Sequence, residues 1–263
     1  MSTAGNMLRF IGACIKANWK GAMEFRAGFL AQVFFMLLNN GTWIVFWWLF
    51  FDRFNVVAGW TMNDILQLWA FAAGAFGWIN VLFGNCFRLA GMIAGGELDV
   101  YLGMPKPVLL HAMLSRTILS AYGDLLFAVA MFFLGGGSLA KFPLFLLGVF
   151  LGGWILVSLM VMVQSLAFWI GNAEGLSLQF GNALLTFTTY PTDIFHGVTR
   201  VMLFTVLPAG FISIMPIRLI REFSWEFLPM ACGVTILFVV LSVWVFHRGL
   251  KRYESGNQVG VRM

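Results

Sequence analysis

The sequence predicts an all-α integral membrane protein: six transmembrane helices, an N-terminal interfacial amphipathic helix, and a re-entrant outer hairpin before the last span. Hydrophobic residues make up 60% of the 263 residues and charged residues only 10%, whereas about 25% of a soluble domain is charged. Several apolar runs approach or exceed the roughly 20 residues that cross a hydrocarbon core. We therefore interpret residues 1–263 as a single transmembrane domain in contact with membrane lipid.

The N-terminal segment 7–26 has the pattern of a helix that lies on a membrane surface. Met7, Ile11 and Cys14 recur at helical spacing, and Lys16 and Lys20 repeat on another face. An amphipathic helix of this kind lies in the headgroup plane.

The predicted spans follow the apolar runs along the chain and cover residues 27–51, 65–83, 109–134, 143–170, 176–190 and 227–246. Between the fifth and sixth spans, residues 190–221 contain Pro191, Pro208 and Pro216, which interrupt two short apolar halves. Non-helical backbone is tolerated at membrane depth where protein or a watery cavity covers it. We therefore expect this region to form a re-entrant outer hairpin and not a seventh span.

The basic residues predict that both termini are cytoplasmic. With the N-terminus inside and six spans, eleven Lys and Arg residues fall inside and five outside, as the positive-inside rule requires. The outer five are Arg53, Lys141, Arg200, Arg218 and Arg221. The net charge of +5 is explained in this way, so we expect no nucleic-acid partner.

The chain carries no motif for ATP binding or catalysis. No GxxxxGK[ST] run is present, and no HExxH, GxSxG or paired-carboxylate arrangement is present either. The cysteines lie far apart without metal-ligand spacing. Asp193 and His196, three positions apart, suit either a metal or acid–base pair or a helix cap, and we favour the cap. We expect no enzyme activity, no metal site and no cofactor bound by this chain.

Polar residues inside the predicted spans are candidate functional residues. Asp124 is an acid well inside the third span, where an ionisable group is a functional hypothesis by default; a hydrogen-bonded structural role is the alternative that we favour. Other polar residues share helix faces, so they either bond between helices or line a path for a polar substrate. These candidates are Gln32, Asn39 and Asn40 in the first span and Gln179, Asn182, Thr186 and Thr189 in the fifth.

The loop at residues 96–107 predicts a short cytoplasmic helix. Leu98, Tyr101 and Leu102 fall on one face of a helical turn, and Glu97 and Asp99 fall in its first turn, where acids favour the helix dipole. Glycines 95 and 96 allow a sharp turn before this helix, and prolines 105 and 107 end it. The loop either contacts a partner protein or lies on the headgroups.

The order of these features resembles the ABC-2 type permeases, most closely the small permeases of largely uncharacterised bacterial ABC transport systems. The runs that carry the resemblance are GGELDVYLGMPKPVLLHAMLSR (residues 95–116), SLAFWIGNAEGL (165–176) and YPTDIFHGVTRVMLFTVLPAGFISIMPIRLI (190–220). The resemblance implies a bacterial inner-membrane permease that pairs with a second copy or a related permease. Two cytosolic ABC ATPase subunits, which bind ATP and Mg, would drive transport. The expected ATPase-contact residues are Glu97, Leu98, Asp99, Tyr101, Leu102 and Pro105.

The resemblance also implies export of a hydrophobic or amphipathic substrate, either a drug, a lipid, a polysaccharide or a peptide. The sequence leaves open the identity of the substrate, the direction of transport, and whether the permease forms a homodimer or a heterodimer. A non-transporting membrane scaffold or assembly factor is the alternative function, followed by an intramembrane enzyme, for which Asp124 has no catalytic partner in the sequence.

Overall fold

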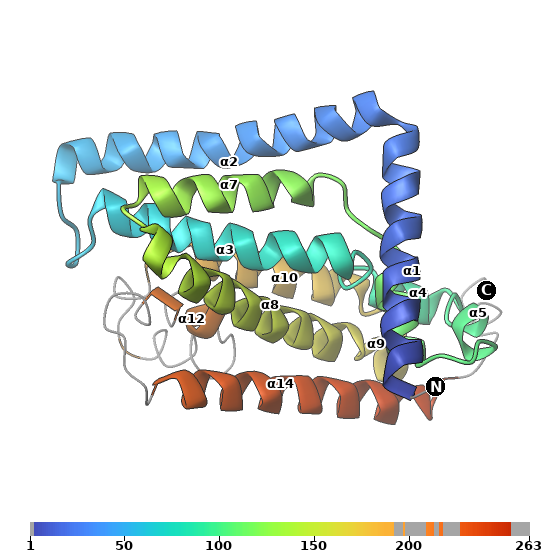
Figure 1. Ribbon diagram of the computed structural model, residues 1–263. Coiled ribbons are helices and arrows are strands. Elements are labelled where there is room, and N and C mark those ends of the chain that lie inside the picture. The colour runs from blue at the N-terminus through green and yellow to red at the C-terminus, as the bar shows by residue number, and fades with distance from the viewer. Residues whose placement is uncertain (1–2, 192–196, 198–208, 213–215, 218–226, 254–263) are drawn as a thin grey trace.

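The computed structural model describes residues 3–191, 197, 209–212, 216–217 and 227–253. Over these residues the chain is helical, and their β pairing is limited to one isolated bridge between Val57 and Trp60. Long helices lie side by side and reverse direction in succession (Figure 1). These helices are α2 (Arg26–Phe54), α3 (Met62–Leu82), α7 (Ala121–Leu134), α8 (Phe142–Gln164), α10 (Glu174–Thr189) and α14 (Phe227–Leu250).

Shorter helices gather at the ends of this bundle. At the end where α3 finishes lie α4 (Leu89–Ala94), α5 (Asp99–Leu102), α6 (Val108–Leu114) and α9 (Ala167–Ile170). At the opposite end lie η1 (Leu139–Lys141) and α12 (Ala209–Ile212). The predicted outer hairpin, residues 190–221, lies mostly outside the described residues. The part that is described includes α12, which packs so closely on α8 that a Cβ at Gly152 would stand 2.6 Å from the carbonyl oxygen of Ile212.

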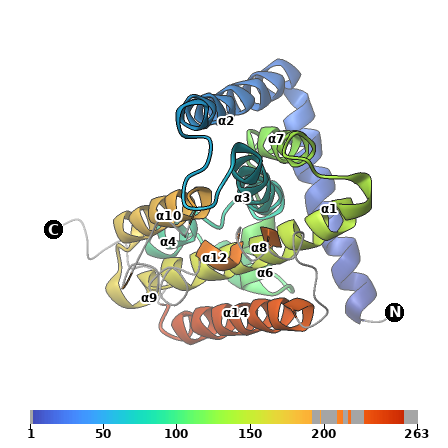
Figure 2. The ribbon, with the colours of Figure 1, turned by 90° about the vertical axis from the view of Figure 1, so that its left-hand side faces the viewer.

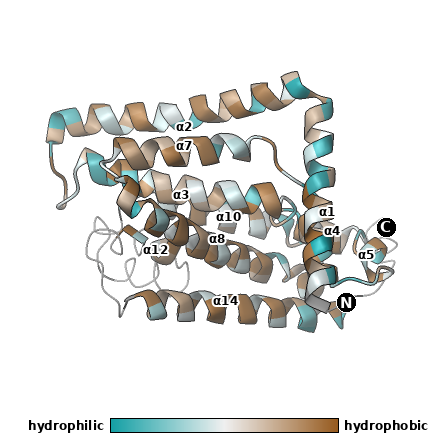
Figure 3. Ribbon diagram, viewed as in Figure 1, coloured by the Kyte–Doolittle hydropathy of each residue, from teal (hydrophilic) through white to brown (hydrophobic). Residues whose placement is uncertain are grey.

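The N-terminal helix α1 (Thr3–Glu24) crosses the end of the bundle at which α4 and α5 lie (Figure 1). Its inner side contacts protein: the Asn18 amide donates to the carbonyl of Leu114 at 2.9 Å, and the Phe10 ring meets the His111 ring edge-on at 4.8 Å. Figure 3 shows hydrophilic and hydrophobic residues mixed along α1 and mostly apolar colour along α8 and α14. The predicted helix is therefore present, and its position at a membrane surface stays a prediction.

Within the described residues, four helices are long and apolar enough to cross a membrane. They are α2, α3, the run Leu139–Ile170 that contains α8, and residues Leu228–Leu250 of α14. The helices α7 and α10 run beside them with 14 and 16 residues. The chain is therefore a multi-pass helical membrane protein, and the predicted count of six spans, which needs α7 and α10, stays a prediction.

The predicted third span is wrong as a continuous helix, because residues 115–120 separate α6 from α7. This stretch bonds to the end of α3. The backbone amide of Gly84 donates to the carbonyl of Arg116 at 3.0 Å, and the backbone amide of Ile118 donates to the carbonyl of Asn80 at 3.0 Å. The Thr117 hydroxyl adds a bond to the carbonyl of Val81 at 2.7 Å. These long-range bonds satisfy backbone groups that a continuous helix would satisfy internally.

The predicted fourth span lies within one run, Leu139–Ile170, that is long and apolar enough to cross a membrane; in this run a two-residue turn separates the end of α8 at Gln164 from the start of α9 at Ala167. At the break, the Ser165 hydroxyl donates to the carbonyl of Val161 at 2.6 Å, a back-bond that bends helices. The Gln164 side chain accepts from the amide of Ala90 at 2.7 Å and so ties the break to α4.

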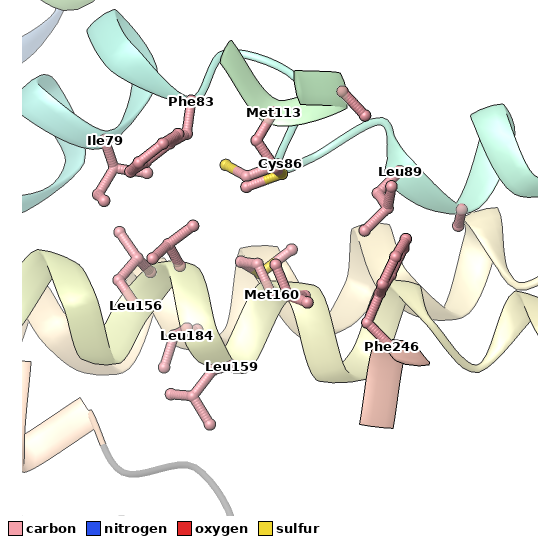
Figure 4. Packing of buried hydrophobic residues seen from close by; sticks show 14 of the residues in the cluster. Ile79, Phe83, Cys86, Leu89, Met113, Leu156, Leu159, Met160, Leu184 and Phe246 are labelled. Carbon is pink, nitrogen blue, oxygen red and sulfur yellow. The ribbon is translucent and has the colours of Figure 1, made fainter. Parts of the chain in front are cut away.

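The core is built around α3, which lies between α2 and α7 on one side and α8 and α10 on the other (Figure 2). One apolar cluster joins the end of α3 to α8, α10 and α14, with Ile79, Leu156, Met160 and Phe246 almost fully buried (Figure 4). A second cluster at the other end joins α3 to α7, α8 and the C-terminal part of α2. This packing surrounds α3 and leaves much of α2 exposed.

Candidate functional site

A cavity of about 520 Å³ lies between α2, α3, α7 and α10. Most of its wall is apolar, and α3 contributes Trp69, Ala72, Ala73 and Phe76 to it. Polar side chains from every one of these helices, or from the residues beside them, also reach it; they are Asn39, Asn40, Asn80, Ser120, Asp124, Thr186, Thr189 and Tyr190. The structure thus gathers polar residues from distant parts of the sequence around one space inside the helix bundle.

The centre of this site is a hydrogen bond between two buried side chains. The Asn40 amide donates to Oδ1 of Asp124 at 2.7 Å, and the two residues are 7% and 6% exposed. Gly123 makes the approach possible, because a Cβ there would stand 2.7 Å from the carbonyl oxygen of Val33 on α2. A polar pair between membrane helices binds α2 to α7 and also presents a carboxyl group to the cavity.

An aromatic wall lies one helical turn from this pair. Trp43 of α2 stacks on Trp69 of α3 with ring centroids 6.1 Å apart, and Phe127 of α7 meets Trp69 edge-on at 6.4 Å. Both tryptophans line the cavity. Sequence reasoning missed them; the usable signal was the three-residue spacing that puts Trp43 on the same face of α2 as Asn40.

The candidate path residues are only partly brought together. Asn39, Asn40, Thr186 and Thr189 line the cavity, and the two threonine hydroxyls donate to carbonyls of their own helix. Gln32, Gln179 and Asn182 are exposed on the surface of the described chain and do not line it. A role of these residues in transport stays a prediction.

The predicted ATPase-contact loop forms α5, but its apolar face is divided. Leu98 is fully buried in the core beneath α5, and the Tyr101 hydroxyl turns inward to lie 2.8 Å from Oγ of Ser115. Leu102 is exposed, as are Val100 and Met104. The expected common face of Leu98, Tyr101 and Leu102 is therefore wrong, because α5 is a single turn whose inner side packs on the bundle.

The acids of this loop also differ from expectation. The helix begins at Asp99, so Asp99 lies in its first turn and Glu97 precedes it. Glu97 lies instead 3.9 Å from the guanidinium of Arg88, and both groups are about half exposed. The sharp turn before α5 is present at Gly96, whose φ of +77° is a conformation that suits glycine, and Pro105 is exposed beyond the helix.

Tyr253, shortly after α14, lies near the same loop. The Tyr253 ring meets Phe168 edge-on at 6.1 Å. Burial, and then the nearby carboxylate of Asp99, raise the pKa of Tyr253 to about 12. Tyr253 therefore links the last long helix to the loop that carries α5.

The described residues include no group of three or more His, Cys, Asp or Glu side chains placed to hold a metal ion. Asp193 and His196 lie outside the described residues.

The four described helices that are long and apolar enough to cross a membrane define the class of this chain as a multi-pass helical membrane protein. A family model described as ABC-2 family transporter protein matches residues 37–257. The chain therefore belongs to the ABC-2 transporter family, whose permeases are membrane transport components and not themselves catalytic. Membership implies an ABC transporter system with an ATPase partner. Comparison with curated proteins and with solved structures gave no match.

Proposed function

We propose that this chain is the transmembrane permease subunit of an ATP-driven ABC exporter for a hydrophobic or amphipathic substrate. The observation that carries the proposal is the cavity of about 520 Å³ between α2, α3, α7 and α10, which has both polar and aromatic walls. Pockets that enclose drug-sized molecules measure about 300–1,000 Å³ and combine an apolar lining with few polar groups. Export, as the direction of transport, follows the family resemblance.

The proposal includes six crossings of a bacterial inner membrane with both termini cytoplasmic. In this arrangement α7 and α10 cross beside the four longer helices. Both run alongside α3 in the bundle (Figure 1), and their cavity-facing polar residues suit an interior position. Basic residues at the end of α14, such as Arg248 and Lys251, and those of α1 then lie on the same side, as the positive-inside rule favours.

Energy reaches the permease through its partners in this proposal. Cytosolic ATPase subunits carry ATP and Mg, and a second copy or a related permease completes the assembly. The contact is assigned to the loop around α5, where Val100, Leu102 and Met104 are exposed apolar side chains beside the acids Glu97 and Asp99. Apolar anchors of this kind fill grooves in a partner, and flanking charges fix the orientation.

The two alternative functions find less support in the geometry. An intramembrane enzyme needs an acid–base partner for Asp124, and its hydrogen-bond partner is the amide of Asn40, which does not ionise and so cannot serve as an acid or a base. A scaffold does not need an internal cavity with polar walls.

Substitution of Leu102 by Asp tests the coupling part of the proposal. Leu102 is 47% exposed, so we expect Leu102→Asp to insert normally, to lose the ATPase in co-purification and to lose transport. Leu139→Asp is the matched control, because Leu139 is 79% exposed in η1 at the opposite end of the bundle. If Leu102→Asp retains the ATPase at wild-type yield and transports normally, the loop around α5 is not the coupling element.

A further inference from the structure

We propose that the cavity binds a lipophilic organic cation, with its charged group at Asp124 and its apolar body against the Trp43–Trp69 pair. This inference rests on the proposed function and narrows its substrate class. It starts from the charge of the site. Asp124 lines the cavity, and the described lining residues include no Lys, Arg or His.

The carboxyl group of Asp124 has unused bonding capacity. A carboxylate accepts hydrogen bonds at both oxygens, and among the described residues the bond that Asp124 receives is the one from Asn40 to Oδ1. The Asp124 side chain is 94% buried, and a buried charge is costly unless it is paired. The described lining residues pair it with the Asn40 amide and with no cation. A cationic ligand would supply the missing partner, whereas an anion would be repelled.

The aromatic wall stands where the rest of such a ligand would lie. Trp43 follows Asn40 by three residues on α2, and Phe127 follows Asp124 by three residues on α7. Three residues rise about 4.5 Å along a helix, so one turn separates the acid–amide pair from the rings on both helices. Phe127 contacts Trp69, which stacks on Trp43, so these contacts bring the two helices together around one recognition site.

Acid and aromatic groups at this spacing recognise cations in complementary ways. The carboxylate attracts the charge directly, and indole faces attract it through the negative face of the ring while they also bind flat apolar groups. The volume of about 520 Å³ fits one drug-sized molecule and is too small to enclose a polysaccharide or a folded peptide.

Binding of two probes with matched shape and opposite charge tests the inference. The purified permease in lipid nanodiscs is titrated with tetraphenylphosphonium and with tetraphenylborate, and the uptake by empty nanodiscs is subtracted. We expect saturable binding of the cation to the wild type, and about tenfold or greater weakening in Asp124→Asn, because tenfold corresponds to the loss of about 1.4 kcal/mol of interaction. Asp124→Asn keeps an oxygen that accepts from Asn40. The matched control is Asp52→Asn, an exposed acid at the end of α2.

A second pair of variants tests the aromatic part and does not depend on the fold of Asp124→Asn. Trp43→Leu should weaken tetraphenylphosphonium binding by about 2- to 30-fold, the range of a cation–π contact. Trp48→Leu on the outer side of α2, 58% exposed, should leave it unchanged. Trp43 is itself 44% exposed, so its replacement spares the core.

Three results would overturn the cation site: no saturable binding of tetraphenylphosphonium to the wild type, equal affinity in Asp124→Asn, or tetraphenylborate binding at Asp124 as tightly as the cation does. If any of these results is found while ATPase coupling is normal, the proposed substrate class is wrong and the proposed transporter function is unaffected. If Leu102→Asp retains its ATPase and transports normally, the coupling part of the proposed function is wrong, and the binding measurements still test the cation site independently.

Discussion

The helices α2 and α3 have equal mean hydropathy over their most apolar stretches, yet 11% of that stretch is buried in α2 and 72% in α3. The difference lies in side-chain size. The central helix α3 carries Ala70, Ala72, Ala73, Gly74, Ala75 and Gly77, and the outer helix α2 carries Trp43, Phe46, Trp47, Trp48, Phe50 and Phe51. In lipid there is no hydrophobic driving force between helices, so membrane helices associate where small residues allow close packing. Hydropathy thus predicts that a helix lies in the membrane, and side-chain size predicts its place in the bundle.

The second outer helix, α14, follows the same rule with 17% of its apolar stretch buried. It contacts the bundle through a few positions, such as Phe246, which lies fully buried near Leu89 and Met160 (Figure 4). The outer helix α2 likewise uses few buried residues, and one of them is Asn40. Outer helices in this bundle are therefore held along one narrow face, and the central helix over most of its surface.

The largest expected effect comes from filling the small-residue surface of α3. A Cβ at Gly74 would stand 2.7 Å from a methyl group of Val149, so Gly74→Leu should destabilise the protein by roughly 3 kcal/mol through overpacking. Gly41→Leu in α2 is the matched control, because a Cβ there meets nothing within 4 Å. Thermal melting in detergent, followed by size-exclusion chromatography, should show a lower melting temperature for Gly74→Leu alone. Equal melting of the two variants would refute the distinction between central and outer helices.

An intermediate effect is expected at the contact that holds α2 to α7. Asn40→Leu removes the donor to Asp124 and leaves a buried carboxyl group without its partner, which costs about 1–3 kcal/mol. Asn39→Leu is the control, since Asn39 is exposed and the amide that donates to Asp124 is that of Asn40. Melting measurements should therefore separate two adjacent, chemically identical substitutions. The same loss of stability in both would mean that the bond between Asn40 and Asp124 does not anchor α2.

The sequence predicted the first and last long helices well. The expected span at 27–51 lies within α2, and the expected span at 227–246 lies within α14, because each is one long apolar run. The break between α6 and α7 was not predictable, since it depends on bonds from residues 116–118 to the end of α3, more than thirty positions away. Local pattern cannot report such partners.

The candidate site was predictable in part for the same reason. Asp124 and Asn40 stood out as polar residues in apolar spans, but their pairing joins positions 84 apart. Trp43 shares a helix face with Asn40, but Trp43 and Trp69 were not singled out, because aromatic residues in spans usually mark the lipid interface. At α5, periodicity placed Leu98 on a docking face, whereas tertiary packing turned it into the core.

The smallest expected effect concerns the anchor at the end of α14. The pKa of Tyr253 is raised to about 12 by burial and by Asp99, so the folded protein holds this proton more tightly than the unfolded chain, whose tyrosines titrate near 10. The stability that Tyr253 contributes is therefore complete below about pH 10 and is lost as the pH rises through 12. Melting temperatures of the wild type and Tyr253→Phe should differ by a constant amount up to about pH 9.5 and then converge or cross, because phenylalanine has no proton to lose. The effect is small because it involves one partly exposed contact at the bundle end. Parallel curves up to pH 11.5 would show that folding does not raise the pKa of Tyr253.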